Sequence, residues 1–207
     1  MRPQQRPLEP DSPSGILRKL GEDLLSPGQL ARLTRPSMSA GIAFDVLVEL
    51  DSELGGWGLH NIDKLPWTTS ERAVWRPLQY CSLHFRILEN PEWLTRAIVA
   101  YCGLHLEGLV ARGTGRRGKA LGQMLDGEKE RIVAGVGEET WSQLRRFADL
   151  NNLAKHDVDL PVGGDHLFSP EDARVAYSVC RRLAVQLYRY AGVSAAELTS
   201  HTPPAQE

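Results

Sequence analysis

Apolar residues recur every three or four positions along most of this chain, the spacing that places them on one face of an α-helix. The clearest faces are Leu94, Ile98, Tyr101, His105 and Leu109, and then Ala173, Ala176, Tyr177, Cys180, Ala184, Leu187 and Ala191. The pattern predicts helices at about 15–25, 28–34, 38–54, 71–89, 91–111, 119–134, 139–156 and 170–191. No stretch alternates apolar and polar residues for long enough to predict a strand. We therefore expect an all-α, single-domain helical bundle.

Several of these helices begin with a capping sequence. Ser26-Pro27-Gly28-Gln29 offers a capping hydroxyl, a proline at the first helical position and a glutamine that can complete a capping box. Asn90-Pro91-Glu92 and Ser169-Pro170-Glu171-Asp172 repeat this arrangement. Phe168 and Ala173 stand where a hydrophobic staple would lie.

The pattern divides the chain into four segments. Residues 1–14, rich in Pro, Gln and Ser, and residues 194–207 are expected to be disordered tails. Residues 15–70 would hold N-terminal helices and an irregular, aromatic-containing loop from Gly55 to Ser70. Residues 71–193 would form the core of the bundle.

Composition narrows the class of protein. A chain of 207 residues with 42% apolar residues is long enough for one well-buried core. The net charge of −2 gives no global basic field, so a polyanion would need a local patch. Cys81, Cys102 and Cys180 sit among apolar residues, which indicates reduced thiols in a cytoplasmic protein. The longest uncharged apolar run, Ala97 to Leu106, is about half of a membrane span, and the N-terminus does not have the pattern of a secretory signal, so we expect no membrane association.

The segment at 139–156 carries the densest group of chemically capable side chains. At about 100° per residue, Leu144, Phe147, Leu150 and Ala154 would form its core face. Arg145, Asp149, Asn152 and His156 would form a polar stripe on the other side, flanked by Asn151 and Lys155. A solvated helix face is one explanation. Two successive asparagines, however, lower helix propensity and add hydrogen-bonding capacity, which favours a functional site.

Three pieces of the chain, within about 91–191, resemble the HEPN family of helical bundles. They are Tyr101-Cys102-Gly103-Leu104-His105-Leu106-Glu107-Gly108-Leu109, then Leu144-Arg145-Arg146-Phe147-Ala148-Asp149-Leu150-Asn151-Asn152-Leu153-Ala154-Lys155-His156-Asp157, and Phe168-Ser169-Pro170-Glu171-Asp172-Ala173 opening a long last helix. The family signature is an arginine, a polar residue, three variable positions and a histidine. Asn152 and His156 match the polar residue and the histidine, while Asn151 stands at the arginine. The resemblance implies a HEPN-like bundle with additional N-terminal helices.

The same resemblance implies a function. Active family members are homodimers that cleave RNA without a metal or another cofactor, in toxin or antiphage-defence systems. His156 would then handle a proton at the ribose 2′-hydroxyl, and Asn152 would orient that histidine or the scissile phosphate. Because Asn151 replaces the arginine, Lys155 or Arg145 would have to supply the cation at the phosphate. The alternative is a non-catalytic module that docks a partner protein or a nucleotide through the same polar stripe.

Two further groups of residues add to these candidates. Arg96, Ala100, Gly103 and Glu107 share one helix stripe, whose small residues would let another helix approach, so that Glu107 could pair with Lys155 or orient His156. The glycine-rich segment Gly113 to Gly118 fits the letters of a dinucleotide fingerprint but follows a helix, which excludes that interpretation. Four basic residues on it could hold RNA phosphates, or simply solubilise a connection: Arg112, Arg116, Arg117 and Lys119.

The near-copies Tyr80-Cys81-Ser82-Leu83-His84 and Tyr101-Cys102-Gly103-Leu104-His105 could place two cysteines and two histidines around zinc. Buried cysteine and histidine are also ordinary core residues. We therefore predict no metal site, with zinc as the alternative.

Overall fold

The computed structural model describes residues 12–36, 38–54, 69–87, 92–156 and 168–194. Within these ranges every regular element is a helix, which confirms the all-α prediction. The helices are α1 (Pro13–Leu24), α2 (Pro27–Leu33), α3 (Ala40–Leu54), α4 (Thr69–Ile87), α5 (Glu92–Thr114), α6 (Leu121–Gly127), α7 (Lys129–Val136), α8 (Glu138–His156) and α9 (Pro170–Tyr188).

Two of the predicted capping boxes are present. The Ser26 side chain accepts from the Gln29 backbone N–H at 3.2 Å, and the Gln29 side chain accepts from the Ser26 N–H at 3.0 Å, at the start of α2. At α9, Ser169 and Asp172 form the same reciprocal pair. Phe168 and Ala173, the two residues of the predicted staple, are both buried. Of the third predicted cap, Asn90 and Pro91 lie outside the described residues.

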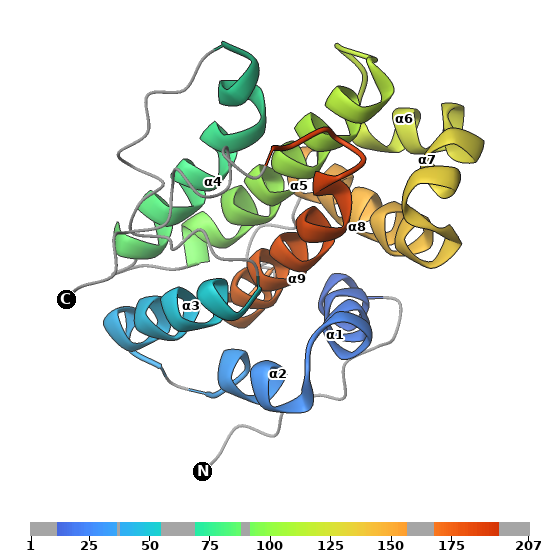
Figure 1. Ribbon diagram of the computed structural model, residues 1–207. Helices are drawn as coiled ribbons and strands as arrows, with labels where there is room; N and C mark the ends of the chain where they lie inside the picture. The colour runs from blue at the N-terminus through green and yellow to red at the C-terminus, as the bar shows by residue number, and fades with distance from the viewer. Residues whose placement is uncertain (1–11, 37, 55–68, 88–91, 157–167, 195–207) are drawn as a thin grey trace, which may run out of the picture.

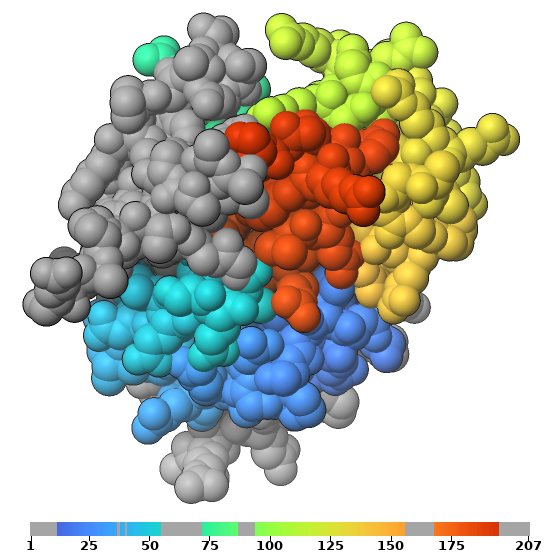
Figure 2. Space-filling model, viewed as in Figure 1, coloured from blue at the N-terminus to red at the C-terminus, as the bar shows by residue number. Residues whose placement is uncertain are grey.

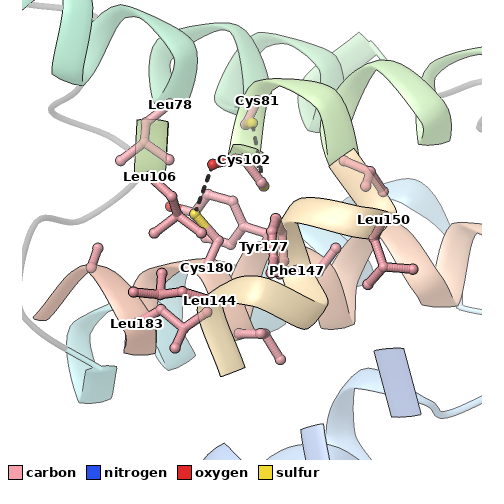
Figure 3. Close-up of a cluster of buried hydrophobic side chains, with 14 of the residues drawn as sticks. Leu78, Cys81, Cys102, Leu106, Leu144, Phe147, Leu150, Tyr177, Cys180 and Leu183 are labelled. Carbon is pink, nitrogen blue, oxygen red and sulfur yellow. Dashed lines mark hydrogen bonds between the residues drawn. The ribbon is translucent and has the colours of Figure 1, made fainter. Parts of the chain in front are cut away.

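The bundle is built around α5, which packs against α4, α8 and α9 (Figure 1). Helices α4 and α5 run antiparallel. Cys81 contacts the Ile98 carbonyl, while Val74, earlier on α4, accepts a hydrogen bond at 2.6 Å from Nδ1 of His105, which lies later on α5. Figure 3 shows the core where α4 and α5 meet α8 and α9. Cys81 and Cys102 lie 3.9 Å apart in it, and Cys180 of α9 donates to the Cys102 carbonyl. All three cysteines are free and buried, as the sequence indicated.

The N-terminal helices cover α9. Helices α1 and α3 both pack against it, and Figure 2 shows α9 at the centre of one face with α1 to α3 along its lower edge. A buried ion pair links Arg181 of α9 to Asp51 of α3, 2.6 Å apart with both side chains 0% exposed. Tyr177 donates to the same carboxylate at 2.9 Å. The extra helices are therefore joined to the bundle by a polar network as well as by apolar packing.

Three expectations differ from the structure or fall outside it. The single helix expected at 119–134 is two helices, because Glu128, with φ −124° and ψ 26°, leaves the helical region directly after Gly127, a poor helix former. The first helix begins at Pro13, inside the tail expected at 1–14, because Ser12 caps it. Residues 55–68, most of the expected aromatic loop, and residues 1–11 and 195–207 lie outside the described residues.

The segment Leu94–Thr114 of α5 is long and apolar enough to cross a membrane, by length and composition alone. Half of it is buried inside the bundle, where α5 contacts α4, α6, α8 and α9. The central helix of a soluble protein has these properties, so the structure is consistent with a soluble protein.

Candidate functional site

The last two turns of α8 lie directly against α5, and the contact depends on a glycine. A Cβ atom at Gly103 would lie 2.1 Å from both Cγ and Oδ1 of Asn151. Asn151 is 1% exposed. With its amide oriented to satisfy both neighbours, it donates to the Ala100 carbonyl at 3.3 Å and accepts from Lys155 Nζ at 3.3 Å. The residue at the arginine position of the signature is therefore part of the α5–α8 interface.

Lys155 continues this interface to the start of α6. Its Nζ lies 3.2 Å from Glu107 Oε2, and both side chains are about three-quarters buried. The same Glu107 oxygen accepts from the Leu121 N–H at 3.0 Å, at the first residue of α6. The pairing expected of Glu107 with Lys155 is thus present, and this carboxylate joins three helices.

Arg96 completes the stripe of α5. Its Nε donates to the Ala154 carbonyl at 2.6 Å, in the last turn of α8. All four members of the stripe, Arg96, Ala100, Gly103 and Glu107, therefore contact α8. The close approach predicted from its small residues is confirmed.

The outward side of α8 forms one wall of an open groove of about 840 Å³ against α6. Arg145 in this groove binds Asp126 at 3.0 Å and also binds Asp149 on its own helix. The hydrogen bond to Asp149 raises the pKa of the Arg145 guanidinium above its usual range. Asn152 and Leu153 line the same groove and are exposed. Asn152 is thus available to a ligand, whereas Asn151 is not.

His156 is the last residue of α8, one turn after Asn152. Its side chain lies outside the described part of the structure. Its role as an acid or base, taken from the resemblance to the HEPN family, stays a prediction.

The five residues predicted to bind nucleic acid separate into three places. Arg112, Arg117 and Lys119 line one cleft beside α4 and α5. Arg116 lies elsewhere, with its Nε 2.7 Å from the Glu128 carboxylate, and Arg145 lies in the α6–α8 groove. Two arginines that sequence reasoning missed, Arg72 and Arg76 of α4, line the first cleft. Their spacing of four residues on one helix was the available signal.

The two histidines of the alternative zinc site each bond to a backbone carbonyl. His105 Nδ1 donates to the Val74 carbonyl, and burial lowers the pKa of this histidine to about 3. His84 Nδ1 bonds instead to the Tyr80 carbonyl. Among the residues that the structure describes, no three potential metal ligands come together.

The electrostatics of α8 limit what its end can do chemically. Phosphoryl chemistry in RNA needs a cation that can approach the phosphate. The two candidate cations, Lys155 and Arg145, already carry carboxylate partners. A phosphate in the groove would also meet Asp126 and Asp149. The arrangement is suited to hydrogen bonding and mixed-charge contacts more than to stabilising a dianionic transition state.

Comparisons of the chain with protein-family models, with curated proteins and with solved structures find no match. Its function is therefore inferred from the chemistry of its own residues.

Proposed function

We propose that this protein is a non-catalytic, HEPN-like binding module of the cytoplasm that docks a partner protein through the outward face of α8. The observation that carries the proposal is the neutralisation of both candidate catalytic cations, Lys155 by Glu107 and Arg145 by Asp126 and Asp149. Asn151, at the position of the missing arginine, is buried and bonded within the fold. The parts of α8 that remain exposed are suited to binding.

The groove chemistry favours a protein over a nucleotide as the ligand of this face. Its two carboxylates would repel phosphates. Its exposed amide, Asn152, can donate and accept hydrogen bonds, and Leu153, 36% exposed, adds an apolar anchor to its lining.

A second copy of this chain is the partner that this surface fits first. A two-fold interface must be self-complementary, and this groove carries both signs of charge on one helix, at Arg145 and Asp149. The proposal therefore includes a homodimer.

Light scattering coupled to gel filtration tests the docking surface. Wild type should reach twice the chain mass of 23.0 kDa at high concentration. Leu153→Arg should remain a monomer, because it replaces an apolar side chain of the proposed interface with a charged one. Leu83→Arg is the matched control, since Leu83 is also exposed, at 42%, but lies on α4. A wild type that stays monomeric throughout, or equal effects of both substitutions, would contradict the proposal.

Incubation with single-stranded RNA tests the catalytic alternative. Purified wild type and His156→Ala should both leave the RNA intact, and induced expression of either should leave growth unchanged. Cleavage or growth arrest by wild type that His156→Ala abolishes would establish an endoribonuclease and overturn the non-catalytic proposal.

A further inference from the structure

A second cleft, of about 820 Å³, opens between α4, α5 and the segment that follows α5. At one point along this cleft, α4 and α5 approach closely. A Cβ atom at Gly108 would lie 2.8 Å from the Ala73 carbonyl oxygen, so the backbone of α4 rests on this glycine. Three small or apolar side chains form the lining between the helices: Pro77, Leu104 and Ala111. The cleft is separate from the α6–α8 groove proposed for protein docking.

One end of the cleft is strongly basic. Its lining residues include five cations, which are Arg72, Arg76, Arg112, Arg117 and Lys119. Across the residues that the structure describes, no hydrogen bond or ion pair engages Arg72, Arg76, Arg117 or Lys119. Among the lining residues that the structure describes, the one carboxylate is that of Glu107, which is already paired with Lys155. In a chain of net charge −2, this gathering of positive charge is local and calls for an anion.

The other end of the cleft is aromatic. Tyr80 of α4 is 41% exposed although it is a large ring, and its centroid lies 5.1 Å from that of Tyr101 of α5, with the planes inclined by 41°. Both rings line the cleft. Exposed tyrosines beside an apolar wall can hold the apolar part of a ligand, because each ring offers a large contact area at a small entropic cost.

Along α4, Arg72 and Arg76 lie eight and four residues before Tyr80, which at about 1.5 Å per residue places them roughly 12 Å and 6 Å from it along the helix. We infer that this cleft binds an organic phosphate, with its phosphate among Arg72, Arg76, Arg117 and Lys119 and its apolar body packed against the pair formed by Tyr80 and Tyr101. Phosphate fits better than carboxylate, because several guanidinium groups can share its two charges and three oxygens. The apolar body is either a ring or a short chain.

A small ligand fits the cleft better than a polymer. The volume of about 820 Å³ falls in the range of sites that enclose one small molecule. Proteins that bind single-stranded nucleic acid instead use a groove that follows about 4–16 nucleotides and several stacking platforms. Here the described part of the lining holds one aromatic pair, Tyr80 and Tyr101.

Calorimetry with four probes measures how much the phosphate and the apolar body each contribute to affinity. The probes are 1-naphthyl phosphate (ring and phosphate), decyl phosphate (chain and phosphate), inorganic phosphate (head alone) and 1-naphthol (body alone). One of the first two should bind at least about tenfold more tightly than inorganic phosphate and naphthol, because only it uses both ends of the cleft. Which of the two binds more tightly identifies the body as ring or chain.

Variants then place the ligand. Arg117→Glu combined with Lys119→Glu should weaken the better probe by about tenfold or more, through loss of charge-assisted contacts. Arg116→Glu is the matched control, since Arg116 is on the same segment, next to Arg117, but pairs with Glu128. It should change affinity less than twofold. Tyr101→Ala should weaken the better probe and leave inorganic phosphate unchanged, while Tyr101→Phe retains binding.

Three results would overturn the inference. They are the absence of binding by both organic phosphates at millimolar concentration, equal binding by naphthol, and an Arg116→Glu effect as large as that of the double reversal. Arg76→Gln provides a second variant on the rigid part of α4, with an expected loss of affinity of about three- to tenfold. Because Leu153→Arg should not alter binding here, failure of the docking proposal would remain distinguishable.

Discussion

The side chain of Asn151 on α8 occupies the space in which a side chain at Gly103 on α5 would have to lie, with only 2.1 Å from a Cβ at that glycine to the Asn151 amide. The two helices can pack this closely, and bury the Asn151 amide, only because position 103 has no side chain. The contact also sets the place of Lys155, one turn further along α8.

Gly103→Ala should therefore destabilise the protein, although alanine is the better helix former. Overpacking a filled core costs about 1–3 kcal/mol, which exceeds the gain of about 0.5–1 kcal/mol from removing a helical glycine. Urea unfolding measures the difference. Gly41→Ala in α3 is the control, since a Cβ atom at that glycine would have no atom within 4 Å, and it should not lower stability. Equal behaviour of the two variants would mean that Gly103 is not needed for packing.

Glu107 and Lys155 should be energetically coupled. Their side chains are 24% and 23% exposed, so a double-mutant cycle with Glu107→Gln and Lys155→Met should give about 0.5–1 kcal/mol of coupling. The exposed pair Arg18 and Glu22, at 59% and 48%, is the control and should give less. Glu107→Ala should cost more than Glu107→Gln, because the Leu121 N–H at the start of α6 then loses its acceptor. A coupling of zero would show that the pair does not hold α8 to α5.

The buried pair of Arg181 and Asp51 should make the largest single contribution. Arg181→Met leaves the buried Asp51 carboxylate without its cation, although Tyr177 still donates to it, which should cost about 3–5 kcal/mol in the free energy of unfolding. Arg182→Met, one residue away on the exposed side of α9, should change it by less than about 0.5 kcal/mol. Combining Arg181→Met with Asp51→Leu should restore part of the loss. If Arg181→Met alone were neutral, α3 would not be anchored through this pair.

These residues show how far the sequence predicts the structure. Helical periodicity alone placed Leu144, Phe147, Leu150 and Ala154 in the core, and all four are buried. The stripe of α5 that contains small residues predicted the approach of a second helix. This was possible because the spacing of the stripe is a local property of one helix. Arg181 could not be predicted in the same way. Its partner Asp51 is 130 residues away, and an arginine in a helix pattern is ordinarily expected to be exposed.

The candidate site follows the same division. Asn151 and Asn152 are adjacent, and periodicity put both near one stripe, but the burial of Asn151 depends on the missing side chain of Gly103 on another helix. The basic cleft needed the register of α4 against α5, which brings Arg72 and Arg76 beside the segment holding Arg117 and Lys119. Register between helices is a tertiary property that a single sequence pattern does not contain.

Stability should fall with acid through His105. Burial lowers the pKa of this histidine from 6.5 to about 3, so it stays neutral in the folded protein while the unfolded chain takes up a proton below pH 6.5. The unfolded state then binds more protons, and the free energy of unfolding should decrease by up to about 1.4 kcal/mol per pH unit from roughly pH 6 toward pH 3, with no contribution above pH 7. Urea unfolding at pH 7.5, 6.0 and 5.0 measures this slope. His105→Gln cannot titrate, and its side-chain amide can still donate to the Val74 carbonyl. Its free energy of unfolding should therefore depend less steeply on pH by that amount, even if the variant is less stable at every pH. Parallel profiles for the two proteins would show that His105 is protonated equally in the folded and unfolded states, and that it is not buried as a neutral ring.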